Sequence, residues 1–368
     1  MTDLRLALVG PMPPPEGGMA NQCRQLALLL GAQYVAVEVI RSNAPYRPAW
    51  LGKLRLVRSQ ARLLPYLWAL WRGIGKADIV HVFANSGWAW HLCAAPAIAI
   101  SRLRRRPVIV NYRGGGAQEF LERAPFWVTR TLRSVDSLVV PSGFLHSVFA
   151  TFGIESRIIP NIIDLQRFHP ATGERNARAP HVIVTRNLEA IYDVGTAIRA
   201  LERLRKQVPD AHLTIAGTGP ELGELQRLVA SLGLDRAVRF AGRIDNAAIA
   251  ELYRAADAVL NPSLVDNMPV SVLEAFASGV PVVSTNVGGV PFIAQDGRNA
   301  LLVPPKDPEA CAAALCRVLT DSSLADRLVR AALEDAVSYS WDRVSVLWLA
   351  EYRRAATTVR PGHRTTPA

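Results

Sequence analysis

Cysteine is scarce in this chain, and its placement excludes several classes of protein. The four cysteines, Cys23, Cys93, Cys311 and Cys316, form no CxxC pair. A structural zinc site or a disulfide framework needs closer or more numerous cysteines. The sequence therefore predicts free thiols and no metal, as is typical of a protein in a reducing cytoplasm.

Long apolar runs are also missing. No stretch of about 18 apolar residues is free of charge, so no membrane-spanning helix is predicted. The longest apolar stretch, residues 87–100, is expected to form a buried helix instead. The opening residues, MTDLRLALVG, lack the charged and then apolar pattern of a signal peptide and are expected to form a first strand.

Lysine is rare, and the excess of positive charge is confined to the first half of the chain. Residues 1–180 contain 22 Lys and Arg against 10 Asp and Glu, whereas residues 181–368 contain 20 against 21. An anionic partner is therefore expected for the first half. Nucleic acid is not predicted, because no recognition motif accompanies the charge.

Residues 50–76, WLGKLRLVRSQARLLPYLWALWRGIGK, combine tryptophan and leucine with basic residues. This composition favours a helix lying in an anionic membrane interface. An ordinary helix that covers a sheet explains the pattern as well. Pro65 is expected to kink or split the helix.

Strands and helices alternate along both halves. Strands are expected at 4–9, 34–40, 78–83, 107–112, 137–140, 181–185, 212–216, 237–241, 258–260, 281–284 and 300–303. Helices are expected at 19–30, 88–102, 308–319, 323–337 and 342–356, and between the strands of the second half. This order predicts an α/β protein with two Rossmann-like domains and a ligand cleft at the carboxyl ends of their strands.

The expected domain boundaries follow from composition. Residues 1–168 form the first domain, the polar segment 169–180 is the linker, and residues 181–341 form the second domain. A C-terminal helix at about 342–358 is expected to pack back on the first domain, and residues 359–368 are expected to be disordered.

The segment 261–291, NPSLVDNMPVSVLEAFASGVPVVSTNVGGVP, carries the most specific chemistry. Asp266 and Glu274 stand eight positions apart, and Pro269 suits the first turn of a helix between them. The N–H groups of Met268, Val270 and Ser271 are then expected to face an anion. Carboxylates accept hydrogen bonds from hydroxyls, so the pattern predicts a site for a sugar nucleotide.

Other strand-end loops offer further binding groups. Arg186 ends the strand HVIVTR and would hold a diphosphate. Arg113 in NYRGGG would hold an anion or an acceptor. The loops PPPEGGMA, with Gly17 and Gly18, and GTGPE, with Gly217 and Gly219, would let a phosphate approach the main chain. Plain turns and a surface arginine explain these features as well.

Several familiar catalytic patterns are absent. The chain contains no GxGxxG, P-loop, nucleophile elbow or HExxH motif. His81 and His146 are expected to be structural, because no carboxylate or second histidine stands at a useful spacing.

Taken in order, these motifs resemble family 4 glycosyltransferases, which are retaining enzymes of the GT-B fold. The matching segments are PPPEGGMA, PNIIDLQRFHP, AGTGPE, FAGRI followed by ELYRAADAVLNPS, and Asp266-x7-Glu274. The resemblance implies a nucleotide-sugar donor bound mainly by the second domain, an acceptor bound by the first, and neither metal nor other cofactor.

The resemblance also implies a role for each matched position. Glu274 would bind the ribose hydroxyls, Asp266 would lie by the donor sugar, and Arg186 would neutralise the diphosphate. The main chain of Asn267, Met268 and Pro269 would contact sugar and phosphate, and Gly17 or Gly18 would approach the diphosphate.

Three positions depart from the family pattern. Asp266 replaces a more common glutamate, and Ile191 stands where a lysine usually completes the diphosphate clamp. Arg113 with Gly114 replaces a histidine and glycine. Arg113 or Arg243 is expected to substitute for the missing lysine. The sequences NYRGG and TRNLE together are expected to mark a subgroup.

The predicted function is hexosyl transfer with retention, from a nucleotide sugar to a lipid-linked or polysaccharide acceptor in cell-envelope polysaccharide biosynthesis. The protein is expected in the cytoplasm, peripheral on the inner face of the membrane through its basic half. A sugar-nucleotide epimerase is one alternative, although it would need additional acid/base groups. A non-catalytic sugar-nucleotide-binding protein is another, because Ile191 and Arg113 replace functional residues.

Overall fold

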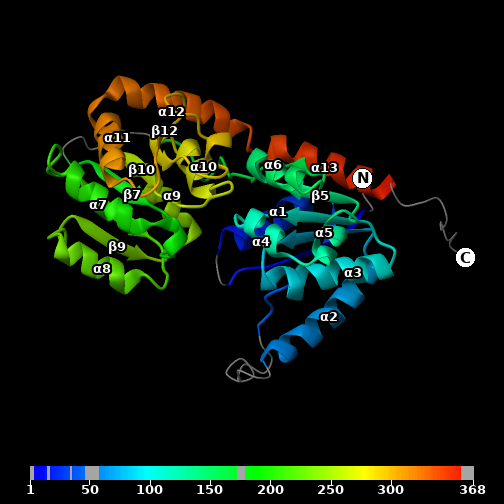
Figure 1. Ribbon diagram of the computed structural model, residues 1–368. Coiled ribbons are helices and arrows are strands. Elements are labelled where there is room, and N and C mark those ends of the chain that lie inside the picture. Colours follow the sequence, from blue (N-terminus) through cyan, green and yellow to red (C-terminus); the bar gives the residue numbers. More distant parts are fainter. Residues whose placement is uncertain (1–3, 15–16, 34, 46–57, 172–178, 358–368) are drawn as a thin grey trace, which may run out of the picture. The chain divides into compact units, whose positions relative to one another are not determined.

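The computed structural model describes residues 4–14, 17–33, 35–45, 58–171 and 179–357 (Figure 1). The expectations for residues 50–57, for most of the linker and for the tail 359–368 fall outside these residues. The chain divides into two compact units. Unit 1 comprises Met1–Ile162 and Val344–Ala368, and unit 2 comprises Ile163–Arg343.

Unit 1 is built on a parallel sheet of six strands in the order β2-β1-β3-β4-β5-β6. Its strands are β1 (Arg5–Gly10), β2 (Ala36–Arg41), β3 (Ile79–Ala84), β4 (Val108–Tyr112), β5 (Ser137–Val140) and β6 (Arg157–Ile158). Its helices are α1 (Gly18–Ala32), α2 (Arg58–Lys76), the π-helix η2 (Trp90–Ala94), α3 (Ala95–Leu103), α4 (Ala117–Arg123), α5 (Phe126–Leu132), α6 (Gly143–Thr151) and most of α13 (Trp341–Thr357).

Successive side chains along each strand point to opposite faces of this sheet. Ala7, Val80 and Val108 pack into one core with buried residues of α2, α3, α5 and α6. Neighbouring positions such as His81 and Asn111 face the other way. The inner strands β1, β3, β4 and β5 are therefore buried on both sides, as expected of a parallel sheet, whereas the edge strands β2 and β6 are largely exposed.

The C-terminal helix α13 belongs to unit 1 from Val344 onward. Trp348 and Tyr352 are fully buried, and their rings stand 4.6 Å and 5.9 Å from the ring of His81 in β3. The end of the chain therefore completes a core begun by its first half.

Unit 2 contains a second parallel sheet, in the order β12-β11-β10-β7-β8-β9. Its strands are β7 (His181–Val184), β8 (His212–Ala216), β9 (Val238–Gly242), β10 (Ala258–Asn261), β11 (Val282–Thr285) and β12 (Leu301–Val303). Its helical segments are η3 (Ala190–Tyr192), α7 (Val194–Leu204), α8 (Leu222–Ser231), α9 (Asn246–Arg254), α10 (Val270–Ala277), η4 (Val290–Phe292), α11 (Pro308–Thr320) and α12 (Ser322–Val337).

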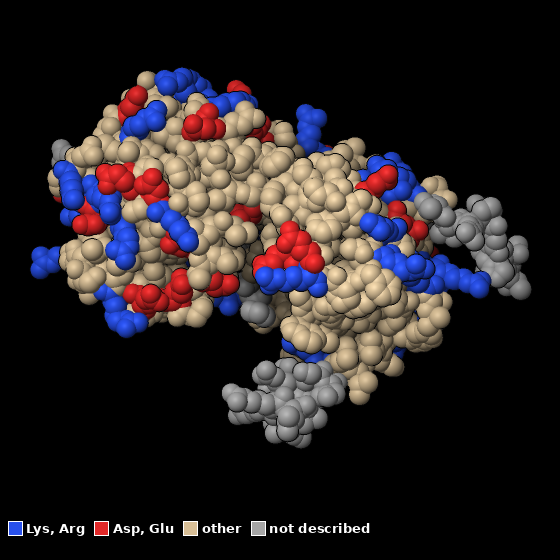
Figure 2. All heavy atoms as spheres, viewed as in Figure 1, with Lys and Arg blue, Asp and Glu red and all other residues tan. Residues whose placement is uncertain are grey.

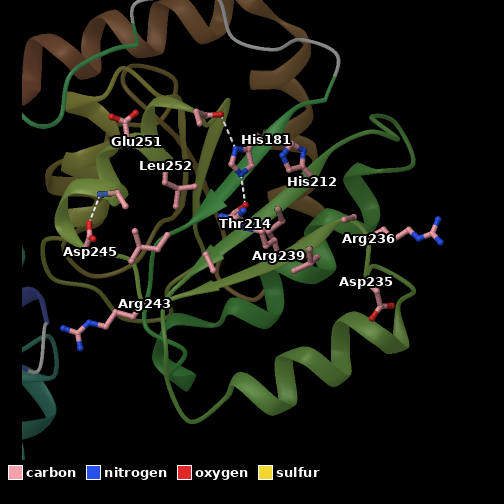
Figure 3. A pocket seen from close by; sticks show the side chains of 17 residues that line it. His181, His212, Thr214, Asp235, Arg236, Arg239, Arg243, Asp245, Glu251 and Leu252 are labelled. Carbon is pink, nitrogen blue, oxygen red and sulfur yellow. Dashed lines mark hydrogen bonds between the residues drawn. The ribbon is translucent and has the colours of Figure 1, made fainter.

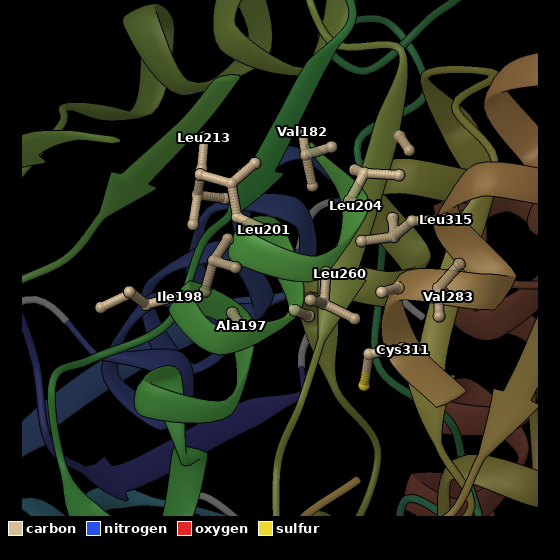
Figure 4. Packing of buried hydrophobic residues seen from close by; sticks show 14 of the residues in the cluster. Val182, Ala197, Ile198, Leu201, Leu204, Leu213, Leu260, Val283, Cys311 and Leu315 are labelled. Atoms are coloured by element: carbon tan, nitrogen blue, oxygen red, sulfur yellow. The ribbon is translucent and has the colours of Figure 1, made fainter. Parts of the chain in front are cut away.

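Leucine, valine and isoleucine fill the core on one face of this sheet (Figure 4). Ile198 and Leu201 of α7 pack there with Leu213 of β8, and Leu315 of α11 joins them. The sequence signal is the spacing of buried residues along α7, three and four apart, which is typical of an amphipathic helix.

Two expected helices of unit 1 differ in detail from the structure. Pro65 does not split its helix, because α2 runs without a break from Arg58 to Lys76. A proline there removes one early hydrogen bond, and Tyr66, Leu70 and Ile74 still anchor the helix in the core. The helix expected at 88–102 is confirmed in extent, because residues 88–103 are helical without a break, but its middle turn is the π-helix η2 and α3 follows directly.

Each sheet has one place where the strand order reverses. The reversal lies between β1 and β3 in unit 1 and between β7 and β10 in unit 2. Ligands of doubly wound sheets bind outside the carboxyl ends of such strands. The segments after β7 and β10 contain Arg186 and Asp266, and the segment after β1 contains Gly17 and Gly18.

Candidate functional site

The reversal point of unit 2 brings two predicted site residues into direct contact. Arg186 follows β7, Asp266 follows β10, and the guanidinium forms a salt bridge with the carboxylate. Both side chains are largely buried, with 12% and 11% of their surface exposed. Burial raises the pKa of Asp266, and the charge of Arg186 opposes that rise.

Arg186 has further contacts that hold its guanidinium in place. It donates to the Ser271 hydroxyl at 3.4 Å and lies 4.2 Å from the centre of the Tyr192 ring. Its buried Nε has no hydrogen-bond partner within the described residues. The arginine is thus oriented but has one donor left for another acceptor.

The start of α10 differs slightly from expectation. Pro269 is the N-cap residue, just before the first helical turn, and its carbonyl accepts from Val272 at 3.2 Å. The missing N–H of proline still leaves no donor unsatisfied. Within the described part of the chain, the first-turn N–H groups of Val270 and Ser271 donate to no main-chain carbonyl. Such groups favour an anion.

Glu274 lies one turn into α10 and is held by a tyrosine that the sequence analysis did not single out. The Tyr253 hydroxyl donates to Glu274 Oε2 at 2.9 Å, and Thr185 Oγ1 lies 2.6 Å from the same hydroxyl. Burial raises the pKa of Glu274 to about 7, although the bond from Tyr253 opposes the rise. This carboxyl can therefore gain or lose a proton near neutrality.

The loop that carries Asp266 rests on a pair of glycines. Gly289 N–H donates to the Asp266 carbonyl at 2.9 Å. A Cβ on Gly288 would stand 2.2 Å from that oxygen, and one on Gly289 would stand 1.6 Å from the Asn267 carbonyl. Only glycine allows this approach, so the Gly-Gly turn positions residues 266–267.

The GTGPE loop has the same structural requirement. A Cβ on Gly217 would stand 1.9 Å from the Arg186 carbonyl, and one on Gly219 would stand 2.2 Å from the Leu188 carbonyl. These glycines therefore support the Arg186 segment directly. Packing accounts for them, and their predicted approach to a nucleotide stays a prediction.

Gly17 and Gly18 differ from these glycines, because no neighbouring atom requires them to lack a side chain. A Cβ at either position would meet no atom within 4 Å, and neither residue has a left-handed backbone. Gly17 lies just before α1, and Gly18 begins that helix. Neither packing nor backbone strain explains these glycines, so open space remains at the start of α1 for an approaching group.

Arg113 ends a directed chain of hydrogen bonds in unit 1. Its Nε donates to Asn111 Oδ1 at 3.2 Å, and Asn111 Nδ2 lies 3.1 Å from His81 Nε2. His81 Nδ1 lies 2.8 Å from the Tyr352 hydroxyl. Arg113 also bonds to Asn161. Burial lowers the pKa of Arg113 to about 10 and that of His81 well below its usual value.

His81 is thus a neutral residue of a structural network, as the sequence predicted. Because the arginine can only donate, Asn111 must present its amide nitrogen to His81. The Nδ1 of His81 then carries the proton and donates to Tyr352. The network holds the Arg113 side chain in place and connects it, through Asn111 and His81, to Tyr352 of α13.

Ile191, which stands at the position of the missing lysine, and the two arginines expected to substitute for that lysine lie in different parts of the fold. Ile191 lies in η3, half exposed, and its carbonyl accepts from Leu264 N–H at 2.8 Å. Arg243 follows β9, two strands from β7, and lines another pocket. Arg113 belongs to unit 1. The sequence analysis missed the ring of Tyr192, which packs on Arg186, because no spacing rule connects it with an arginine six residues earlier.

That other pocket is a hollow of unit 2 with a volume of about 1020 Å³ (Figure 3). It includes the amino ends of β7 and β8, where His181 and His212 stack with ring centres 4.4 Å apart. His181 bonds to Thr214 Oγ1 at 2.8 Å, and its pKa falls to about 4, chiefly through burial. The pocket does not contain Arg186, Asp266 or Glu274.

Two further searches cover the described residues only. No group of three or more His, Cys, Asp or Glu is arranged to hold a metal ion there. None of the helices in the described ranges is long and apolar enough to cross a membrane.

Known families match both halves of the chain. The family described as Glycosyltransferase Family 4 matches residues 16–167, and that described as Glycosyl transferases group 1 matches residues 179–321. Glycogen synthase of Mycobacterium tuberculosis is 30% identical over 293 residues, which cover 76% of this chain and 69% of that protein. D-inositol 3-phosphate glycosyltransferase of Nocardioides sp. is 35% identical over 178 residues, 44% of this chain and 39% of that protein.

Solved structures share the fold at lower identity. Sucrose-phosphate synthase from Thermosynechococcus elongatus has a TM-score of 0.75 at 22% identity, covering 96% of this chain and 99% of that one. Anabaena HepE in complex with UDP-glucose has a TM-score of 0.74 at 16% identity, covering 95% and 99%. The GT-B fold and the predicted enzyme class, a hexosyltransferase-type glycosyltransferase, are confirmed. The chain belongs to the family 4, group 1 glycosyltransferases.

Proposed function

We propose that this enzyme transfers a hexose, with retention at the anomeric carbon, from a nucleotide-diphosphate sugar to a lipid-linked or glycan acceptor in cell-envelope polysaccharide biosynthesis. The observation that carries the donor proposal is the group at the reversal point of unit 2. There Arg186 contacts Asp266 and Ser271 at the start of α10, and Glu274 lies one turn into that helix. A related fold binds UDP-glucose in Anabaena HepE.

Each group has a part in donor binding under this proposal. Glu274, when ionised, accepts hydrogen bonds from the ribose hydroxyls. The main chain of Asn267, Met268 and Pro269 contacts sugar and phosphate, and Asp266 lies by the donor sugar. Gly17 and Gly18 leave room for the diphosphate at the start of α1. No metal is required.

The reaction breaks the bond between the anomeric carbon and the diphosphate oxygen. The acceptor hydroxyl attacks the same face of the sugar and forms the new carbon–oxygen bond. Its proton passes to the leaving phosphate oxygen, so no histidine base is needed. Arg186 and the N–H groups of α10 stabilise the charge that grows on that oxygen.

The salt bridge between Arg186 and Asp266 affects this chemistry. With its carboxylate partner, Arg186 adds little net positive charge to the empty site. Under this proposal donor binding redistributes the bonds that the guanidinium makes with Asp266 and Ser271, so that it can donate to the diphosphate. The absence of a lysine at Ile191 makes this group more important than in relatives that have both cations.

We place the acceptor at the inner face of an anionic membrane, where the enzyme is peripheral. The excess of positive charge in residues 1–180 supports this location. A lipid-linked acceptor is held at such a surface, so the enzyme would meet it in two dimensions.

The donor is tested first by thermal shift with UDP-, GDP- and other nucleotide sugars, since a bound ligand raises the melting temperature. The expected result is stabilisation by one nucleotide series and transfer from it to a glycan or lipid acceptor. Conversion of the sugar of the nucleotide donor into its epimer, in the absence of an acceptor, would instead indicate an epimerase. Binding without transfer across a broad acceptor panel would indicate a binding protein. No binding of any nucleotide sugar would overturn the proposal.

A further inference from the structure

The helix α2 carries two apolar stripes, although a helix that only covers a sheet needs one. Tyr66, Leu70 and Ile74 are buried against the sheet. Leu64, Trp68 and Trp71 follow one another at spacings of four and three, and 67%, 63% and 44% of their surface is exposed. This outer stripe has no partner in the described chain that buries it.

The outer stripe continues onto the neighbouring helices of the same layer. The guanidinium of Arg104, at the end of α3, lies 3.6 Å from the Trp71 ring centre. Arg102 of α3 donates to the Ser134 carbonyl after α5 at 2.6 Å. His91 of η2 lies 5.1 Å from the Trp127 ring of α5 and 6.1 Å from the Trp88 ring.

We call this surface the aromatic face, and it consists of Leu64, Trp68, Trp71, Trp88, Leu92, Leu103, Phe126 and Trp127. Trp88 and Phe126 are 77% and 80% exposed. Among the described residues, five of the six exposed tryptophan and phenylalanine side chains lie on it, and the sixth is Phe292 of unit 2. A hollow of about 330 Å³ lies within it, between α3 and α5.

The charges on this face have one sign. The sequence contains no Asp or Glu in α2, in residues 88–106 or in residues 124–135, whereas these segments contain Arg72, Arg102, Arg104, Arg105, Arg106, Arg130 and Arg133. Figure 2 shows uncharged surface on the side of unit 1 where α2, α3 and α5 lie, with Lys and Arg beside it and a cluster of Asp and Glu at one edge. Arg72 lies 5.4 Å from the ring centre of Trp68.

We infer that the aromatic face docks unit 1 onto an anionic lipid membrane. This deepens the proposed function, because it assigns the surface that would hold the enzyme near a lipid-linked acceptor. Indole and phenyl rings prefer the level of the lipid headgroups, and arginines beside them bind phosphate oxygens. A second copy of the same face is disfavoured as the partner, because like charges would meet.

The experiment measures binding of the full chain to vesicles of phosphatidylcholine, with and without phosphatidylglycerol, by sedimentation and by tryptophan emission. The expected result is binding to anionic vesicles with a blue shift, weakened at least about ten-fold at high salt. The variant Trp68→Ser/Trp88→Ser/Phe126→Ser should lose binding at least about ten-fold, whereas Phe292→Ser in unit 2 should bind as the wild type does.

A second pair of variants tests whether vesicle binding needs the arginines beside the aromatic face or only the positive charge of the whole protein. Arg72→Gln/Arg130→Gln should weaken binding more than Arg199→Gln/Arg330→Gln, which removes the same charge from exposed positions of unit 2. Equal loss in both pairs, or unchanged binding by the triple variant, would overturn the inference. The inference would also be overturned if the face bound double-stranded DNA or a second copy of the chain but did not bind vesicles.

Donor binding by thermal shift is measured on the same variants. The face variants should retain it, because they leave unit 2 unchanged. A wild type that binds nucleotide sugar but no anionic vesicle at low salt would refute the membrane face alone. One that binds vesicles but no nucleotide sugar would refute the proposed function instead.

Discussion

Arg186 is the residue on which the charge of the proposed donor site depends. It has an ion pair with Asp266, an aromatic ring beside it and one unpartnered donor. An arginine held in this way is ordered before the ligand arrives, so little side-chain entropy is lost on binding.

Replacing Arg186 by alanine should lower the rate of transfer by about 10²- to 10³-fold, because the leaving diphosphate loses the guanidinium donors that stabilise its growing charge. Steady-state transfer assays would measure this. Arg199→Ala, at an exposed position of α7 in the same unit, is the control and should keep full activity. Unchanged transfer by Arg186→Ala would remove the arginine from the mechanism. The variant also leaves Asp266 buried without its partner, so its folding must be verified.

Glu274 should make stability depend on pH. Its pKa is raised to about 7 in the folded protein, above the ordinary glutamate value near 4.5. Between these values the folded state binds more protons than the unfolded state. The free energy of unfolding therefore falls as pH rises from about 4.5 to 7, by up to about 3 kcal/mol.

Urea unfolding of the wild type and of Glu274→Gln across this range would detect the effect. The variant should lack this component, so its stability relative to the wild type should increase with pH. Glu334→Gln, on the exposed side of α12, serves as the control and should follow the wild type. A constant difference between wild type and Glu274→Gln would contradict the raised pKa.

At the scale of elements, the loop after β10 depends on the turn after β11. The glycines at 288 and 289 contact the carbonyls of Asp266 and Asn267 without space for a side chain. The two loops are thus one unit of structure, although more than twenty residues separate them.

Gly289→Ala should therefore displace the Asp266 loop, cost about 1–3 kcal/mol in stability and weaken donor binding. Unfolding and nucleotide-sugar titration would be measured on the same sample. Gly223→Ala is the matched control, because a Cβ at that helical position meets nothing within 4 Å. It should be neutral or stabilising. Normal donor binding by Gly289→Ala would show that the loop tolerates the shift.

At the scale of the whole molecule, unit 1 needs the last helix of the chain. Trp348 is fully buried in unit 1, although its sequence neighbours before Val344 belong to unit 2. The two units have separate cores, so they can be destabilised separately.

Trp348→Ala should destabilise unit 1 by about 3–5 kcal/mol, because it leaves a large cavity. Calorimetry should show an earlier transition, whereas nucleotide-sugar binding by unit 2 should persist. Val346→Ala, on the exposed side of the same helix, is the control and should change stability by less than about 0.5 kcal/mol. A single transition, shifted to lower temperature and accompanied by loss of nucleotide-sugar binding, would indicate that the two units unfold together.

The alternation of strands and helices was predictable because apolar runs such as residues 79–84 and 282–285 are buried on both faces of parallel sheets. The short helices α4 and α5 were missed, since their apolar residues span too few turns to show a period. Pro65 misled for a local reason: the packing of α2 outweighs one lost hydrogen bond.

Of the candidate site, the loops at strand ends could be predicted, since parallel strands place their carboxyl ends along one edge. Sequence spacing named Arg186, Asp266 and Glu274 for that reason. Tyr192 and Tyr253 could not be found in this way. Tyr253 reaches the site across a long stretch of chain, as its bond with Thr185 shows, and Tyr192 reaches Arg186 through the irregular path of the segment between them.

The sequence by itself determined the α/β class, the order of the elements and the excess of arginine in the first half, because periodicity, turn residues and charge are local properties. The tertiary structure decided what those residues meet. It paired Arg186 with Asp266, raised the pKa of Glu274 by burial, joined Arg113 to Tyr352 through His81, and gathered the exposed tryptophans on one helical layer. Contacts between distant residues and the loss of water around them exist only once the chain is folded.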